Sequence, residues 1–209
     1  MGPNAGEQAE GDVSLDWLEL PMGRFVMGTD ARDAPEDERP SRSVSVGSLA
    51  ISRLPVTVKD WTRFVEVTGY RTIAEVEGSS FRRCIDPGDP VGALDWWAAG
   101  QGDAQAPVVH VAWLDVWEFC RWAGVRLPTE AEWALAAANE PQLVGDLWQW
   151  CDDWYSADFF RDEQRVNPTG PTSGTHRVAR GGSARPTARA AVMADLSAAD
   201  LGFRVIRRR

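Results

Sequence analysis

The sequence predicts an irregular α+β domain built around a tryptophan-rich core. Segments in which apolar and polar residues alternate, as in half-buried strands, are interspersed with short segments of helical period that carry capping signals. Eleven tryptophans occur among the 209 residues. Because indole rings fill irregular volume between loops, this density is typical of a fold with little regular secondary structure. Four of these tryptophans are expected in the core: Trp61, Trp113, Trp117 and Trp133.

The first third of the chain contains two predicted strand regions and one helix. Residues 17–28 alternate apolar and polar side chains and end in a glycine-flanked hairpin region, and residues 44–51 alternate again after a charged loop. The helix follows Thr57, an N-cap residue with a carboxylate three residues later at Asp60. It is expected to end at Gly69, where a left-handed backbone stops a helix.

A long loop region is predicted over residues 71–106. This stretch has no sustained hydrophobic period and contains many Gly, Pro and Asp residues. Binding surfaces often lie on such loops when a rigid scaffold holds them. Trp96 and Trp97 are adjacent here, and two neighbouring indoles cannot easily both point inward. We therefore expect one of them to line a surface cleft.

The second half of the chain contains two further helices and several short strands. A buried strand over residues 108–113 is expected to lead into a helix over residues 113–123. Thr129 and Glu132 form a capping box, which predicts a third helix that reaches about Ala138. The remaining predicted strands of the irregular sheet cover residues 148–151, 176–180 and 203–206.

The composition indicates one domain over residues 15–209, preceded by a disordered leader over residues 1–14. With 44% apolar and 25% charged residues, the chain can bury one sizeable core. Its net charge of -9 argues against a nucleic-acid partner, and no stretch approaches the roughly 18 to 20 apolar residues of a membrane span. The widely spaced Cys84, Cys120 and Cys151 argue against a zinc cage or disulfide framework and predict a cytoplasmic location.

Several charged residues are expected to have structural roles. An Arg inside an apolar frame usually binds carboxylates or backbone carbonyls and thereby fixes loops. Arg126 and Arg204 are in this situation, and Glu130, Glu132 and Asp153 are their candidate partners.

The two histidines and the hydroxyl groups do not indicate a hydrolytic site. His110 lies in the predicted apolar strand and is expected to be a satisfied core residue, whereas His176 is expected to be exposed. Asp152 and Asp153 would point to opposite faces of a strand, so we expect a solvated face rather than an acid–base pair. No Gly-x-Ser-x-Gly elbow surrounds Ser183.

Several short blocks occur in the order that is characteristic of a known family. They are Pro55–Val56–Thr57, Arg126–Leu127–Pro128–Thr129–Glu130, Arg180–Gly181–Gly182–Ser183 and Gly202–Phe203–Arg204. Together, over about residues 16–209, they resemble the formylglycine-generating enzyme or sulfatase-modifying factor family. The resemblance implies that family's fold, an irregular variant of the C-type lectin fold.

The resemblance also implies a pair of copper-binding cysteines after the Arg–Gly–Gly–Ser block. Residues 184–193, where the pair would lie, contain no cysteine. Because Cu(I) selects soft sulfur ligands, copper is not an expected cofactor and cysteine oxidation is not an expected activity. Met193 does not replace the thiols and is expected in the core.

A calcium site is a further implication of the resemblance. Members of the family often bind calcium at a Gly–Asn–Val–Trp–Glu–Trp block, which reads Gly–Asp–Leu–Trp–Gln–Trp over residues 145–150 of this chain. The candidate ligands are the side chains of Asp146 and Gln149 and the backbone oxygen of Leu147. Calcium accepts carboxylate, amide and carbonyl oxygens, so we hypothesise a retained but weakened site.

Two functions remain open at this point. The first is a binding module without thiol redox chemistry, which presents Trp96, Trp97, Ser183, Arg185 and Arg189 to a peptide, protein or small-molecule ligand. The second is a repurposed tailoring enzyme that acts on a peptide or siderophore-like substrate in a biosynthetic pathway. No catalytic residue is assigned, and neither nucleic acid nor a membrane is an expected partner.

Overall fold

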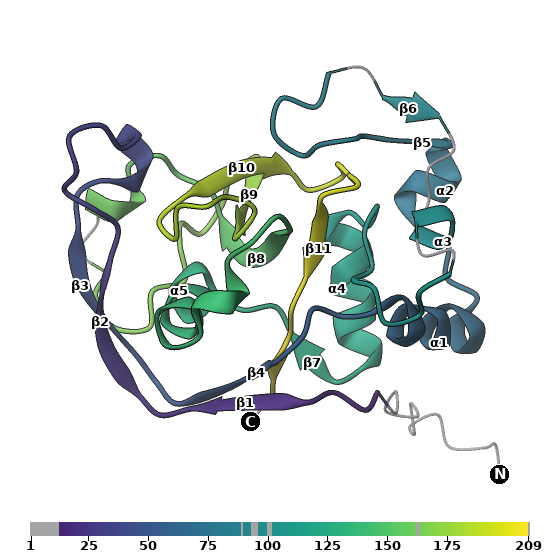
Figure 1. The fold of residues 1–209 in the computed structure, drawn as a ribbon, viewed down its shortest axis with the longest axis horizontal. Coiled ribbons are helices and arrows are strands. Elements are labelled where there is room, and N and C mark those ends of the chain that lie inside the picture. Colours follow the sequence, from purple (N-terminus) through teal and green to yellow (C-terminus); the bar gives the residue numbers. More distant parts are fainter. Residues whose placement is uncertain (1–12, 89, 93–95, 100–101, 162–163, 209) are drawn as a thin grey trace, which may run out of the picture.

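The protein folds into two four-stranded sheets, two hairpin-like pairs and five short α-helices within the part of the chain described here (Figure 1). The computed structural model describes residues 13–88, 90–92, 96–99, 102–161 and 164–208. Most of the predicted leader lies outside these ranges. The helices are α1 (Val58–Thr68), α2 (Ile73–Glu77), α3 (Trp96–Ala99), α4 (Trp113–Trp122) and α5 (Glu130–Asn139). Three 3-10 turns are η1 (Glu36–Glu38), η2 (Pro141–Leu143) and η3 (Phe159–Arg161).

The two larger sheets bring together strands from distant parts of the sequence. One sheet has the order β1-β4-β12-β7, formed by β1 (Trp17–Leu20), β4 (Leu49–Ser52), β12 (Ile206–Arg207) and β7 (Val125–Arg126). The other has the order β10-β9-β8-β11, formed by β10 (Arg189–Met193), β9 (His176–Arg180), β8 (Trp148–Trp154) and β11 (Leu201–Phe203). Only the β8–β11 pairing within this sheet is parallel.

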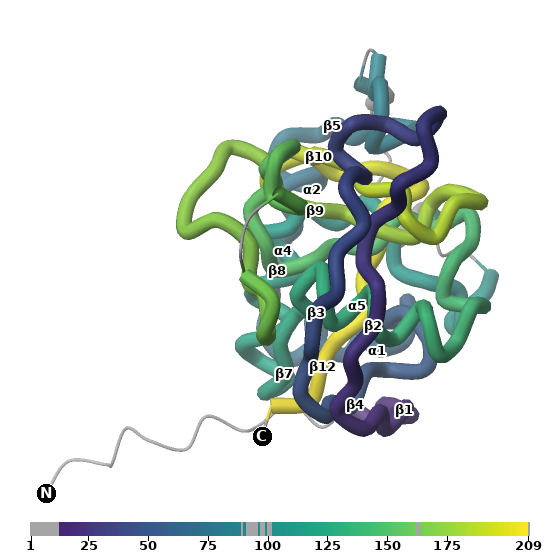
Figure 2. Tube along the Cα trace, turned by 90° about the vertical axis from the view of Figure 1, so that its left-hand side faces the viewer, coloured from purple at the N-terminus to yellow at the C-terminus, as the bar shows by residue number. Residues whose placement is uncertain are grey.

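The smaller sheets lie outside these two. β2 (Gly23–Met27) and β3 (Arg42–Val46) pair antiparallel and run side by side along one face of the molecule (Figure 2). β5 (Ser79–Ser80) pairs with β6 (Val91–Gly92). Helix α5 packs against β2, β3, β8 and β9, so it joins the outer pair to the central sheet.

The capping signals set the helix boundaries as predicted. The hydroxyl of Thr57 accepts from the backbone N–H of Asp60, and Gly69 ends α1 with a φ of 67°. The hydroxyl of Thr129 accepts from the backbone N–H of Glu132, which starts α5. These contacts satisfy N–H groups that the first turn of a helix leaves without partners.

The core is rich in aromatic rings, as the composition predicted. The rings of Trp61 and Phe119 stack at 5.5 Å, and Phe203 meets Phe119 edge-on at 5.4 Å. Such contacts add about 0.5–1.5 kcal/mol each to the burial of the rings. Trp113 and Trp133 are buried as expected, but Trp117 is 43% exposed on the outer face of α4. The expectation for Trp117 was therefore wrong.

Several local predictions are corrected by the structure. Residues 17–28 form two strands, β1 and β2, which belong to different sheets. Residues 108–112 form no regular strand, because their backbone N–H groups form hydrogen bonds to separate loops and His110 has a φ of 58°. Asp153 is buried rather than solvated, and Met193 is exposed rather than in the core.

His110 is nonetheless a core residue. It is 2% exposed, and its Nδ1 lies 2.7 Å from the hydroxyl of Ser80. None of the helices in the described ranges has the length and apolar character that crossing a membrane requires.

Candidate functional site

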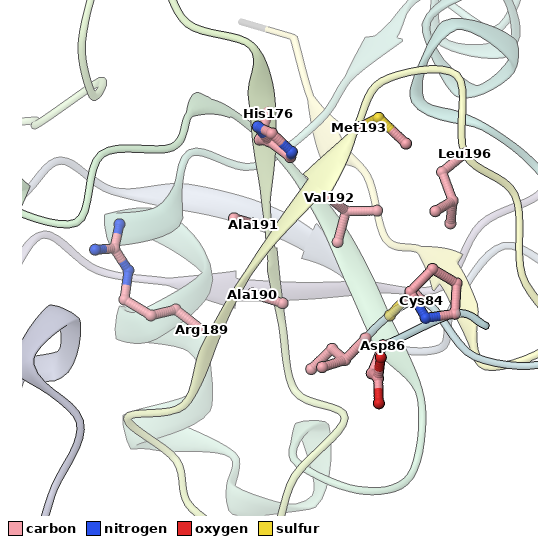
Figure 3. A pocket seen from close by; sticks show the side chains of 11 residues that line it. Cys84, Asp86, His176, Arg189, Ala190, Ala191, Val192, Met193 and Leu196 are labelled. Carbon is pink, nitrogen blue, oxygen red and sulfur yellow. The ribbon is translucent and has the colours of Figure 1, made fainter.

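A cavity of about 300 Å³ lies beside β10, the strand that follows the Arg–Gly–Gly–Ser block (Figure 3). We call it the β10 cavity. Its lining residues are Cys84, Ile85, Asp86, Pro87, His176, Arg189, Ala190, Ala191, Val192, Met193 and Leu196. Most of these side chains are small or apolar. Asp86, His176 and Arg189 are the polar or charged residues of this lining.

The segment that replaces the expected cysteine pair contributes directly to this cavity. Ala190 and Val192 are buried, whereas Ala191 and Met193 are exposed at its edge. This alternation follows from the two-residue period of a strand. A cavity wall of alkyl groups and one thioether therefore stands in the segment where the resemblance implies reactive sulfur.

The three thiols do not fit a copper site. Burial raises the pKa of Cys84, Cys120 and Cys151, so all three stay protonated near neutral pH. Copper(I) binds the thiolate rather than the thiol. None of the three forms a disulfide, and the described residues contain no group of three or more His, Cys, Asp or Glu side chains arranged to hold a metal ion. The residues present do not fit the family's metal.

The five predicted ligand-binding residues do not converge on one described cavity. Trp96 is 4% exposed and its indole N–H donates to Glu75 at 3.3 Å, so it belongs to the core. Trp97 lies in α3, but its side chain is outside the described residues. Ser183 is half-buried, and its hydroxyl accepts from the backbone N–H of Arg185 at 3.3 Å.

The two predicted arginines are held by acidic side chains. Arg185 is 57% exposed and donates to Glu38 at 2.7 Å. Arg189 borders the β10 cavity, but its guanidinium points away from Cys84 and Leu196 (Figure 3). It donates to both carboxylate oxygens of Glu130 at 2.8 Å. The binding role of these residues stays a prediction.

Glu130 is the centre of a buried ionic cluster. It is fully buried and accepts from Arg189 and from Nη1 of Arg180, the latter at 2.9 Å. Burial alone would raise the pKa of Glu130, but the two guanidinium groups outweigh this effect and lower it. The carboxylate therefore stays ionised and links α5 to both β9 and β10. Sequence reasoning had instead placed Glu130 among the candidate partners of Arg126 and Arg204.

The two expected arginine contacts are confirmed in part. Arg126 binds Glu132 through two hydrogen bonds of 2.7 Å. Arg204 donates to Gln149 at 2.9 Å and to backbone carbonyls of residues 52 and 53, without a carboxylate partner among the described contacts. Burial lowers the pKa of Arg204 to about 10.

The residues of the hypothesised calcium site do not fit a cation. The amide oxygen of Gln149 accepts from Trp133 at 3.0 Å and from Arg204 at 2.9 Å, while its Nε2 donates to the carbonyl of Leu143 at 3.0 Å. The indole of Trp133 and the guanidinium of Arg204 can only donate hydrogen bonds. Exchanging the oxygen and nitrogen of the Gln149 amide would therefore place its NH₂ group against two donors, so the orientation is fixed. The side-chain oxygen thus points away from the carbonyl of Leu147, which Nε2 approaches at 3.5 Å. The candidate ligand Asp146 is exposed.

The Arg–Gly–Gly–Ser block has a structural explanation. Gly181 has a φ of 102°, and a Cβ there would lie 2.9 Å from Nε2 of Gln149. A Cβ on Gly182 would lie 2.2 Å from Cδ1 of Trp148. Only glycine permits this close approach. The block packs the loop onto β8 and leads the chain towards β10.

Sequence reasoning missed several residues of the β10 cavity. Cys84, Asp86 and Leu196 come from irregular segments without a hydrophobic period, so no local signal places them beside β10. Asp86 and His176 are the titratable side chains of the cavity apart from Cys84 and Arg189, and they lie at its opposite ends (Figure 3). The described residues thus provide no acid–base pair there.

Comparison with known proteins places this geometry in context. The family model of the sulfatase-modifying factor enzyme 1-like domain matches residues 6–142 and 140–209. A formylglycine-generating enzyme of Thermomonospora curvata is 32% identical over 283 aligned residues, which cover 92% of this chain and 93% of that protein. The inactive C-alpha-formylglycine-generating enzyme 2 of Mus musculus is 39% identical over 155 residues, covering 64% of this chain and 50% of that protein.

Two solved structures have the same fold. The structure of PvdO from Pseudomonas aeruginosa matches with a TM-score of 0.72 and 18% identity, covering 92% of this chain and 94% of that one. Variable protein 1 of Treponema denticola matches with a TM-score of 0.65 and 19% identity, covering 96% and 98%. At these identities the likeness concerns the fold alone.

Proposed function

The chain belongs to the family of sulfatase-modifying factor enzyme 1-like domains, and on this basis we propose that it is a ligand-binding member without thiol oxidation chemistry. In this proposal the β10 cavity takes an apolar group of a peptide or small molecule. One observation carries the proposal: the segment expected to hold the cysteine pair has become part of a cavity wall made of Ala190, Ala191, Val192 and Met193.

The shape and lining of the cavity support an apolar ligand. A volume of about 300 Å³ is at the lower end for small-molecule sites. The side chains of Val192 and Leu196 are buried, and Met193 is 47% exposed at the edge. Methionine adapts its conformation to differently shaped partners. These features favour a ligand that inserts an alkyl or aromatic group into the cavity.

The proposal is tested with amide-capped amino acids as probes. N-acetyl-leucine amide and N-acetyl-phenylalanine amide are titrated into the protein while backbone amide NMR shifts are followed, with N-acetyl-aspartate amide as the polar comparison. We expect saturable shifts in β10 with the apolar probes only. The absence of shifts in β10, or equal shifts with the aspartate probe, would overturn the proposal.

A matched pair of variants ties the binding to the cavity. Ala191 is exposed and lines the cavity, so Ala191→Trp covers its opening without entering the core. Val67 is 52% exposed on α1 and outside the cavity lining, so Val67→Trp serves as the control. Binding should be lost in the first variant and kept in the second.

A second candidate is a tailoring enzyme that uses the same cavity for new chemistry on a peptide or siderophore-like substrate. This reading is supported by Asp86 and His176, which supply polar groups for orienting a substrate at opposite ends of the cavity. Metal analysis of the purified protein separates the two candidates. Stoichiometric iron or copper would favour the enzyme, whereas a metal-free protein that binds the apolar probes would favour the binding module.

A further inference from the structure

A second cavity lies on another part of the molecule, between β2 and α5. Its volume is about 300 Å³, and we call it the β2–α5 cavity. The residues that carry the argument are Val26 and Met27 of β2, Ala134 and Ala138 of α5, and Arg180 of β9. The remaining lining is mostly apolar and includes one hydroxyl, that of Thr187, which donates to Glu38; it consists of Phe25, Gly28, Ala137, Pro141, Val144, Pro186 and Thr187. Val26 is 66% exposed, so the cavity has an apolar edge accessible from outside.

Arg180 gives this apolar cavity a polar end. The residue is 2% exposed. Its Nη1 donates to Glu130 at 2.9 Å and its Nη2 to the carbonyl of Pro186 at 2.7 Å. Its Nε is buried and has no hydrogen-bond partner among the described residues. A buried N–H without an acceptor destabilises the folded protein, so a ligand oxygen that reaches it would remove this destabilisation.

The charge balance around Arg180 favours a negatively charged oxygen. Arg180 and Arg189 share the single carboxylate of Glu130, which leaves one positive charge in excess. Among the neighbouring acids, Asp37 acts on Arg189 and accepts from the hydroxyl of Tyr155. Glu38 is paired with Arg185, and burial raises the pKa of Asp153 well above its ordinary value, which disfavours its charged form. An anion placed beside Arg180 would therefore complete the balance.

We propose that the β2–α5 cavity binds an apolar carboxylate, whose carboxylate accepts from Nε of Arg180 and whose apolar body packs against β2 and the alanines of α5. A monoanionic carboxylate fits better than a phosphate because one N–H donor and an apolar wall cannot replace the hydration of a dianion. This site and the β10 cavity share no lining residue. They are connected through Glu130, which binds Arg180 at this site and Arg189 at the β10 cavity. This site does not depend on the function proposed for that cavity.

Octanoate is a suitable probe for this site, with octanol and octylamine as comparisons of equal chain length. The ¹⁵N spectrum of arginine Nε–H groups reports directly on Arg180. We expect octanoate to shift the Nε–H signal of Arg180 and to raise the melting temperature. Octanol and octylamine should do neither. An unchanged Arg180 signal, or equal binding of octanol, would overturn the proposal.

A matched pair on α5 tests the location. Ala138 is exposed and lines the cavity, so Ala138→Trp fills its opening. Asn139 is the next residue, is exposed and is not part of the lining, so Asn139→Trp is the control. We expect Ala138→Trp to weaken octanoate binding by about tenfold or more, which corresponds to about 1.4 kcal/mol, and Asn139→Trp to leave it unchanged. Equal binding by both variants would contradict the assigned site.

Discussion

Removal of the charge on Glu130 is expected to destabilise the whole fold. Glu130→Gln keeps the size of the side chain but leaves the guanidinium groups of Arg180 and Arg189 buried without a counter-charge. The side chains of Arg189 and Glu130 are both 0% exposed and that of Arg180 is 2% exposed, so water cannot take the place of the carboxylate. Breaking a buried pair of this kind costs about 3–5 kcal/mol.

The loss is measured by urea unfolding and by calorimetry at pH 7. For a chain of this length, a loss of about 3–5 kcal/mol lowers the melting temperature by about 6–20 °C. Glu132→Gln on the same helix is the control, because the side chain of its partner Arg126 is 40% exposed. The control should lose about 1 kcal/mol or less. Equal losses in the two variants would refute the reasoning.

The pH dependence of stability gives an independent check on the cluster. Because the pKa of Glu130 is lowered in the folded protein, its contribution to stability is fully present above its ordinary pKa and is lost as the pH falls through its folded value. The wild type should therefore lose more stability than Glu130→Gln on acidification below about pH 4.5. Parallel acid-unfolding curves for the two proteins would contradict this assignment.

Three further outcomes are expected. In the presence of a chelator, Gln149→Glu should have a lower melting temperature than the wild type, because its carboxylate faces backbone carbonyls. Millimolar calcium should restore the melting temperature of the variant and leave that of the wild type unchanged. A variant whose melting temperature does not respond to calcium would contradict this. Asp153→Asn should raise the free energy of unfolding at pH 7 by about 1 kcal/mol or more, since burial disfavours the charged acid. The pKa of Asp153 is raised in the folded protein, so this gain should vanish below the ordinary pKa of an aspartate. A gain that persists in acid would count against this explanation. Gly182→Ala should lower the free energy of unfolding, measured in urea, by about 1–3 kcal/mol, because its Cβ would overlap Trp148. Gly145→Ala should leave this free energy nearly unchanged, because the space around Gly145 is open. Equal losses in the two variants would refute the packing argument.

The elements that the sequence predicted well are those defined by local contacts. The capping boxes at Thr57 and Thr129 lie within four residues of the groups they bind, so the pattern alone locates α1 and α5. The pair Arg126–Glu132 spans only six residues and was also anticipated. The short α2 has the same kind of signal, a capping box from Thr72 to Glu75, but it was overlooked inside a stretch without hydrophobic period.

Long-range pairing could not be predicted in the same way. Glu130 binds arginines that lie 50 and 59 residues away, and no sequence period connects them. Strand partners show the same limit, because β11 and β12 insert beside strands from much earlier in the chain. The resemblance gave the fold, but the lining of the two cavities depends on irregular loops, whose backbone follows tertiary contacts rather than local preference.

The central proposal is that this family member has the scaffold of the family without the oxidation of thiols. The most direct test incubates the purified protein with a cysteine-containing peptide, copper(I) and dioxygen, and detects a peptide aldehyde by mass spectrometry. The Thermomonospora curvata enzyme serves as the positive control. We predict no aldehyde from this protein under conditions in which the control converts the peptide. Aldehyde formed by this protein at a rate similar to the control would contradict the claim.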